Sequence, residues 1–285
     1  MPSGSSWWGW PCRSRPRSRF LTRPLVRWLR DKKGRRFCPG CQGRVIYRLT
    51  EGRFRCGRCR YPLGALTGTW LGQSRVALST WLWLIKLFEL AGTARQAAIQ
   101  VGVSYPTALR AFTTLRRAIL AQEAPGLLRR EVEADESDVG GVRTGNRGAA
   151  GKIPVFGILE RQGRVSVTVV PNVTSKTLLE ETVQMVKRGT LVYTDKWQAS
   201  DALTCCGYRH LKVDHGRRLS RGKVPSNGLE GVWSYAKGKR LQQHGVSPHR
   251  FPLYLSEMQV RYNHRRQDLV HLILHAAVQP VPDLL

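Results

Sequence analysis

Four cysteines in two closely spaced pairs form the most specific chemical motif of the sequence. Cys38 and Cys41 make one C-x2-C pair, and Cys56 and Cys59 make a second after fourteen intervening residues. Each pair fits on a tight turn, so the four thiolates can converge on a tetrahedral zinc ion. The residues between the pairs alternate as a β-hairpin does. We therefore predict a zinc ribbon whose metal is structural, because no ligand position is left open.

Three acidic residues further along the chain could act together on a phosphodiester. Asp135 and Asp195 each end a predicted strand, and such carboxylates meet at one sheet edge if the two strands pair. Glu230 would come over from a helix. Three acids so placed can hold two Mg²⁺ ions about 3.5–4 Å apart, one activating a water or 3′-hydroxyl and the other stabilising the leaving oxygen. Oxygen-only ligands favour Mg²⁺ or Mn²⁺ over zinc.

Each of these acids also has a structural interpretation. Asp195 could cap a helix, and Asp135 could belong to a turn. Asn227 and Glu230 match a capping box, with Glu230 at the third helical position. The joint occurrence of the three acids in so basic a chain favours the catalytic interpretation.

Net charge limits the class of partner. The chain has 47 Lys and Arg residues against 19 acids, a formal charge of +28. Such an excess would destabilise a compact fold by self-repulsion unless a polyanion offsets it, and nucleic acid is the obvious polyanion. The longest apolar run, TWLWLIKLFELAG, is too short to span a membrane and contains Lys86 and Glu89. Since a signal-peptide pattern is not recognised either, we expect a cytoplasmic protein with reduced cysteines.

The elements that must position these residues divide the chain into five regions. The hydrophobic period is helical from Leu78 and changes to two after Arg130. Three strands, a helix, a strand, a helix, a strand and further helices then follow, an order that predicts a mixed α/β domain with a central sheet. The predicted regions are a flexible basic arm (1–36), the zinc ribbon (37–66), a helical region (67–125), the α/β domain (130–266) and a C-terminal tail (267–285).

The helical region contains a helix-turn-helix pattern. Ala98 and Gly102 fall where two helices would cross. Arg116 and Arg117 are expected to contact phosphate rather than bases. An ordinary helical hairpin is the alternative to a DNA-binding unit. In a DNA-binding unit, the second helix would present four residues to a major groove: Ser104, Tyr105, Thr107 and Arg110.

Several segments closely resemble the insertion-sequence DDE transposases that carry an N-terminal zinc ribbon, relatives of the eukaryotic Merlin elements. The likeness covers roughly residues 37 to 266 and holds in order as well as in content. The segments are VEADESDVGG, the basic glycine loop after it, GKIPVFGILER, VVPNVTSKTLL, VYTDKW, and SNGLEGVWSYAKGKR followed by RYNHR.

The resemblance implies an RNase H-like catalytic domain, preceded by the zinc ribbon and the helix-turn-helix region. It implies that Asp135 and Asp195 are the first two metal ligands of an enzyme that cleaves transposon ends and transfers strands to target DNA with Mg²⁺. The family's third ligand is sometimes an Asn, so Asn227 competes with Glu230, and we favour Glu230 because it carries charge. A basic residue two helical turns after the third ligand helps to hold DNA in this family, and Lys237 fits that place.

Further expectations follow for partners. Lys239 and Arg240 would join Lys237 in gripping the DNA backbone, and Trp233 would pack the helix onto the sheet. Two or more subunits would bring transposon ends together, in a protein associated with the nucleoid. The alternatives are a catalytically idle DNA-binding protein derived from a transposase, and an RNase H-like nuclease that recognises DNA structure.

Overall fold

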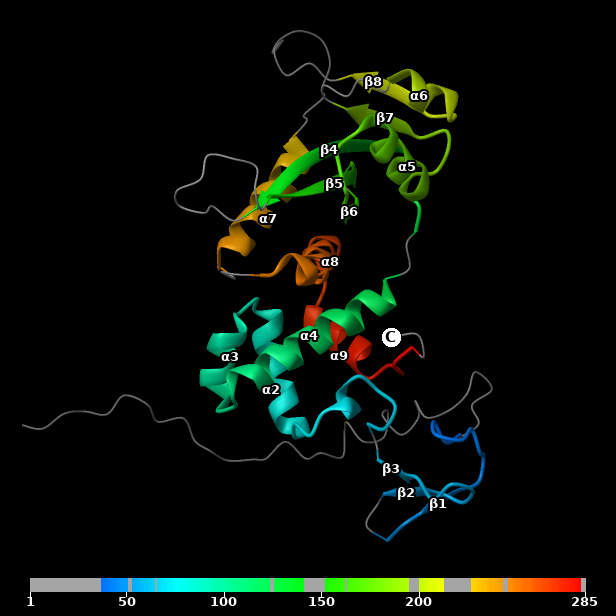
Figure 1. Cartoon of the computed structure of the whole chain (residues 1–285), viewed down its shortest axis with the longest axis vertical. Coiled ribbons are helices and arrows are strands. Elements are labelled where there is room, and N and C mark those ends of the chain that lie inside the picture. The colour runs from blue at the N-terminus through cyan, green and yellow to red at the C-terminus, as the bar shows by residue number, and fades with distance from the viewer. Residues whose placement is uncertain are drawn as a thin grey trace, which may run out of the picture. The chain divides into compact units, whose positions relative to one another are not determined.

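The computed structural model describes residues 37–50, 53–64, 66–123, 126–140, 152–161, 163–194, 200–212, 227–242 and 246–282 (Figure 1). The predicted basic arm and the glycine loop after β4 therefore lie outside the described residues. The chain divides into two compact units, Met1–Arg75 with Val278–Leu285, and Val76–Ala277.

The first unit contains a small antiparallel sheet, as the alternation between the cysteine pairs predicted. Its strand order is β1-β2-β3, and the third strand was not expected from the sequence. The backbone N–H of Val281 donates to the carbonyl of Gly68, so the end of the chain belongs to this unit. The strands are β1 (Ile46–Arg48), β2 (Phe54–Cys56) and β3 (Pro62–Leu63).

Local signals set the ends of the helices that open the second unit. Thr93 makes a capping box with Gln96 at the start of α3, and Gly102 ends that helix in the left-handed conformation (φ 71°), which glycine adopts without strain. Ser104 caps α4 by accepting from the backbone N–H of Thr107. These helices are α2 (Leu78–Glu89), α3 (Ala94–Val101) and α4 (Tyr105–Gln122).

Residues 267–285 were predicted to be a C-terminal tail, but part of this segment forms a helix, α9 (Leu269–Ala277). It packs against α4 and α2, and Ile273, Ala276 and Ala277 are buried there. The side chain of Asp268 accepts a hydrogen bond from the backbone N–H of Val270 and so caps its first turn. The C-terminal segment thus supplies part of the helical core.

A five-stranded mixed sheet forms the centre of the second unit. Its order is β6-β5-β4-β7-β8; β5 lies antiparallel to β4 and to β6, whereas β7 lies parallel to β4 and to β8. In order of appearance along the chain this is 3-2-1-4-5, the topology of the RNase H-like domain expected from the sequence. The strands are β4 (Glu131–Gly140), β5 (Lys152–Glu160), β6 (Val165–Val169), β7 (Leu191–Thr194) and β8 (Arg209–Lys212).

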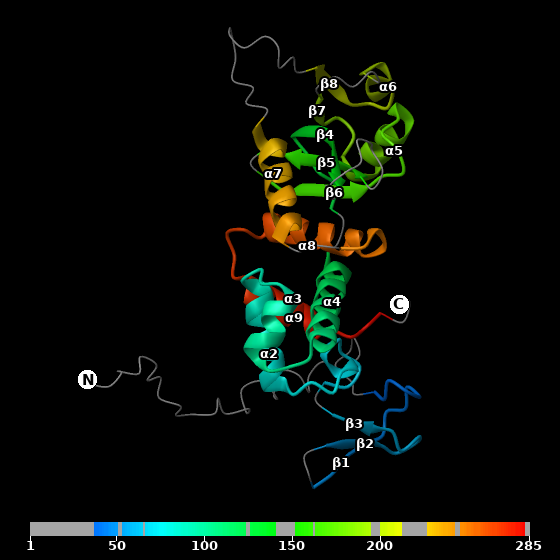
Figure 2. The ribbon, with the colours of Figure 1, turned by 60° about the vertical axis from the view of Figure 1, so that its left-hand side comes forward.

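The two faces of this sheet bury different helices, because side chains alternate along each strand. Val132 and Ala134 of β4 share a core with α5 (Ser175–Met185) and α6 (Ser200–Cys205). Val139 faces the opposite core, with α7 (Asn227–Gln242) and α8 (Phe251–Asn263). Figure 2 shows α7 on one side of the sheet and α5 and α6 on the other. Odd-numbered residues of β4 therefore face α7.

Helix α8 also covers the edge of the sheet. The Asn263 amide accepts from the backbone N–H of Val165 (2.8 Å) and donates to its carbonyl (3.0 Å). The Gln259 side chain accepts from the N–H of Val167 (2.9 Å). Two side chains thus take the place that a further strand would occupy beside β6. Among the described residues, no helix combines the length and the apolar character needed to cross a membrane.

Candidate active site and metal-binding cysteines

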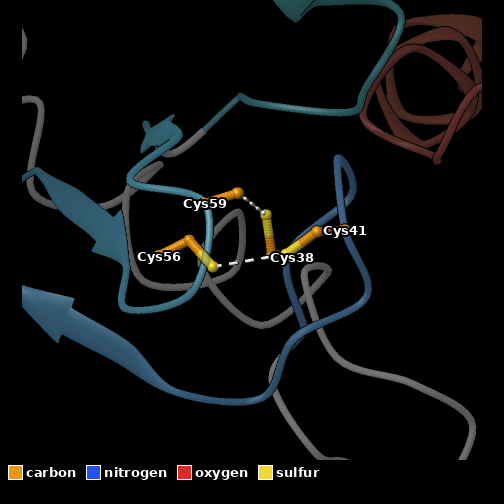
Figure 3. A group of neighbouring side chains, drawn as sticks. All are labelled: Cys38, Cys41, Cys56 and Cys59. Atoms are coloured by element: carbon orange, nitrogen blue, oxygen red, sulfur yellow. Dashed lines mark hydrogen bonds between the residues drawn. The ribbon is translucent and has the colours of Figure 1, made fainter.

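The four predicted zinc ligands come together in the first unit (Figure 3). Their Sγ atoms all lie within 4.8 Å of one another. The Sγ atoms of Cys38 and Cys59 are 3.5 Å apart, as are those of Cys41 and Cys56. A tetrahedral zinc ion with Zn–S bonds of about 2.3 Å would separate its sulfurs by about 3.8 Å. The cluster therefore has the size of a closed zinc site with four thiolate ligands.

The two cysteine turns are built alike. In the first, the backbone N–H of Gln42 donates to the carbonyl of Cys38, and in the second that of Arg60 donates to Cys56. Gln42 and Arg60, each directly after the second cysteine of its pair, have positive φ (55° and 58°). The pKa of Cys56 is lowered to about 6, chiefly because the backbone N–H of Cys59 donates to its sulfur. This hydrogen bond favours the thiolate, the form that binds metal.

Asp135 lies in the middle of β4 and not at its end, which corrects the prediction. The strand continues to Gly140 because β5 pairs with it from Val132 to Gly140, and Asp135 is opposite Gly157. Within the described residues, the parallel pairing with β7 runs as far as Ala134 and Thr194, the residues directly before Asp135 and Asp195. Asp135 thus directly follows the last described pair of this ladder. Asp195 itself lies outside the described residues.

Helix α7 is bonded to Asp135 through Trp233. The indole N–H of Trp233 donates to Oδ2 of Asp135 at 2.9 Å. The ring lies over Gly157, where an added Cβ would stand 2.7 Å from two ring carbons. The predicted packing of Trp233 against the sheet is present, but the hydrogen bond was not foreseen. A glycine inside a strand often marks a close approach of this kind, so Gly157 was the signal available in the sequence.

Glu230 lies in the first turn of α7 and is exposed. Residues three apart are neighbours on a helix surface, so Glu230 is one turn before Trp233. Gly228 packs beside Glu133, since an added Cβ there would stand 3.1 Å from Oε2 of Glu133. Glu230 is therefore on the stretch of α7 that crosses β4 between Glu133 and Asp135. Asn227 begins the helix, and its side chain lies outside the described part of the structure.

Two further acids of β4 are held by one arginine. Arg161 Nε lies 3.1 Å from Glu133 Oε1, and its Nη1 lies 3.4 Å from Glu131 Oε2. The guanidinium also stacks 4.1 Å from the ring centre of Tyr193, whose hydroxyl donates to Glu131 (3.2 Å). Burial, followed by this contact with Glu131, raises the pKa of Tyr193. Glu131 and Glu133 thus belong to an ion-paired cluster beside Asp135.

Known proteins with a similar sequence identify the family. A family model described as the ISXO2-like transposase domain matches residues 127–263. An uncharacterized transposase-like protein of Haemophilus influenzae is 33% identical over 100 residues, which are 35% of this chain and 81% of that protein. The chain belongs to the insertion-sequence transposases. This confirms the resemblance drawn from the strand and helix motifs.

The crystal structure of the Mos1 strand transfer complex is a solved structure with a distant similarity to this chain. The aligned residues cover 71% of this transposase and 76% of the Mos1 chain, with 14% sequence identity and a TM-score of 0.33. The RNase H-like fold of the transposase is assigned from its own strand order.

The predicted DNA-reading residues of the transposase lie around the start of α4. Ser104, Tyr105 and Arg110 are exposed, and Thr107 is partly buried. Ser104 and Thr107 are also bonded to each other through their hydroxyls (2.8 Å), so both have a structural role at this helix start. The Arg95 guanidinium stacks on Tyr105, 5.8 Å from the ring centre. DNA reading by this surface stays a prediction.

The prediction that Arg116 contacts phosphate is wrong, because its side chain is buried. It is 3% exposed; its Nε is 2.6 Å from Glu257 Oε2, and its guanidinium stacks 3.7 Å from the Tyr254 ring centre. Arg117, in contrast, is exposed as expected. On α7 the side chain of Lys237 is exposed, whereas those of Lys239 and Arg240 lie outside the described residues.

Proposed function

We propose that this transposase cleaves DNA at the ends of its element and joins those ends to target DNA, using Asp135, Asp195 and Glu230 to hold two divalent cations. The observation that supports it is the Trp233–Asp135 hydrogen bond, which fixes α7 across β4 at the first acid. Glu230 lies one turn before Trp233, and the described β4–β7 pairs include Ala134 and Thr194, the chain neighbours of Asp135 and Asp195.

The donor atoms suit Mg²⁺ or Mn²⁺. Asp135 is only half-buried, so a ligand can reach its carboxylate, and Glu230 is exposed. Carboxylate oxygens are the ligands that these hard cations prefer. When bound, the ions would supply an activated hydroxyl nucleophile and neutralise charge on the leaving oxygen. Asn227 stays the competing third ligand in this proposal.

The chain itself would hold the DNA backbone. Lys237 is exposed and lies two helical turns after Glu230 on α7, where an ammonium group can pair with a phosphate next to the scissile bond. Lys239 and Arg240 follow on the same helix and extend the cationic stretch. We further propose that the four-cysteine cluster holds one structural zinc ion, and that two or more subunits bring paired DNA ends together.

The decisive experiment uses purified full-length protein, labelled terminal repeats and Mg²⁺. Asp135→Asn and Asp195→Asn should each lower the cleavage rate by about 100-fold or more, because each removes several kcal/mol of transition-state stabilisation. Glu230→Gln should do the same, and Asn227→Ala should not. Glu180→Gln, an exposed acid on the opposite face of the sheet, is the matched control.

The same assay separates the alternatives. DNA binding without cleavage by the unmodified protein under any divalent metal would support the catalytically idle binding protein. Cutting of junctions or hybrids that lack element ends would support the structure-specific nuclease. Unchanged cleavage in Asp135→Asn would contradict the proposed site.

A further inference from the structure

We infer that Trp233 is a positioning residue for the metal-binding carboxylate of Asp135. The inference rests on the proposed function, since it assigns Trp233 the task of orienting one of the proposed ligands toward a divalent cation. The indole contributes through its N–H group, and not only through the area that its ring buries.

The contact joins one fixed donor to one ligand oxygen. Indole Nε1 has a single N–H and no acceptor, whereas an ionised carboxylate offers about four lone-pair directions. The 2.9 Å bond to Oδ2 therefore uses only part of the accepting capacity of Asp135. A carboxylate rotates easily about its terminal torsion, with broad and shallow preferences. The indole restricts that rotation before a cation arrives.

The donor is itself held rigidly. Trp233 is 5% exposed and belongs to the core between the sheet and α7. Two carbons of its six-membered ring would lie 2.7 Å from a Cβ at residue 157, so the glycine is what allows the ring to approach the sheet. Partners of this kind, which fix the ring or carboxylate of a metal ligand, typically change metal affinity by about 10–100-fold.

The indole differs in charge from the arginine that contacts the acid two residues earlier. Glu133 faces the guanidinium of Arg161, which compensates its negative charge. Trp233 instead gives Asp135 an uncharged donor, so this bond orients the carboxylate without itself neutralising it. A buried cation in place of the indole would compete with the metal ion for the same charge.

The test compares Trp233→Phe with Trp81→Phe in the full-length protein. Trp81 is fully buried in α2, and its indole nitrogen has no hydrogen-bond partner among the described residues, so this control removes the same atoms without removing a described bond. Titration with Mn²⁺, followed by calorimetry, should show about 10-fold weaker binding in Trp233→Phe and no more than about 2-fold change in Trp81→Phe. The Mg²⁺ concentration for half-maximal cleavage should shift in parallel.

A second measurement does not require the variant to bind metal or DNA. With ¹⁵N-labelled tryptophan, the indole N–H resonance that Trp233→Phe removes should move when Mg²⁺ is added to the unmodified protein. It should not move in Asp135→Asn. If the chemical shift of this resonance does not change with Mg²⁺ in the unmodified protein, although calorimetry shows that the metal ion binds, the inference is overturned.

The two failures are distinguishable. If Asp135→Asn binds Mn²⁺ and cleaves DNA like the unmodified protein, the proposed function fails. If Asp135→Asn loses Mn²⁺ binding and DNA cleavage but Trp233→Phe behaves as Trp81→Phe does, the proposed function stands. Only the inference about Trp233 is then wrong.

Discussion

Asp135 is the third of three carboxylates spaced two residues apart on the α7 face of β4. These three carboxylates differ in the side chains that contact them. Glu131 and Glu133 are ion-paired with Arg161, and Asp135 is bonded to the indole of Trp233. The residue types and the strand period are visible in the sequence, whereas these partners, 28 or more positions away, are set by the folded sheet. Sequence reasoning therefore found the acid and not its partner.

Substituting Gly157 with Ala should disturb this contact from the opposite side. The new Cβ would overlap the Trp233 ring at 2.7 Å, and overpacking of this kind costs about 1–3 kcal/mol. We expect a lower unfolding midpoint in urea together with weaker Mn²⁺ binding. Gly231→Ala on α7 is the matched control, because its Cβ would meet nothing within 4 Å and should stabilise the helix by up to about 1 kcal/mol. Equal midpoints for the two variants would contradict this account.

Arg116 shows why exposure could not be judged from helix pattern alone. Its spacing on α4 placed it beside Arg117, and both were expected to face phosphate. Its buried ion-pair partner, Glu257, lies 141 residues later in the chain. Arg261 joins the same carboxylate (2.8 Å) and donates to the last carbonyls of α2, at Phe88 and Glu89. One buried acid therefore links three helices.

Helix α8 owes its position to this buried cluster as well as to its apolar face. On one side its Glu257 and Arg261 bind α4 and α2, and on the other its amides bind β6. Caps at Thr93 and Ser104 were predictable because they are local, and so was the alternation of the strands. The order of the strands is not local, which is why only the family resemblance indicated it, and the docking of α8 was not predicted at all.

Glu257→Gln should destabilise the second unit strongly. Removing one member of a buried ion pair leaves an uncompensated charge and costs about 3–5 kcal/mol. Glu89→Gln, which breaks the surface pair with Lys86 (2.8 Å), should cost less than about 1 kcal/mol. Urea unfolding, monitored by circular dichroism, measures both. A loss below about 1 kcal/mol for Glu257→Gln would show that the cluster contributes little to stability.

The two units of the molecule differ in how they are stabilised. The second has buried cores on both faces of its sheet. The first has three strands of only two or three residues, which is too little sheet to be stable without the cysteine cluster. The sequence predicted this cluster and its hairpin, because the four ligands lie within 22 residues and their spacing determines the geometry.

Zinc removal should therefore unfold one unit and spare the other. A strong chelator under reducing conditions should abolish amide-exchange protection across β1 to β3 while protection of β4 and β5 stays unchanged. Cys56→Ser should reproduce this result, whereas Cys205→Ser, an exposed cysteine outside the cluster, should retain zinc. Loss of protection in the central sheet on chelation would show that the units depend on each other.

The amide side chains that cover β6 limit how copies of this protein can associate. Because the N–H and carbonyl of Val165 and the N–H of Val167 are already bonded to α8, a neighbouring copy could continue the sheet at this strand only by displacing these amides. Fibrous growth by strand addition is disfavoured there for the same reason. Pairing of subunits on DNA is therefore expected to use surfaces other than this edge of the sheet.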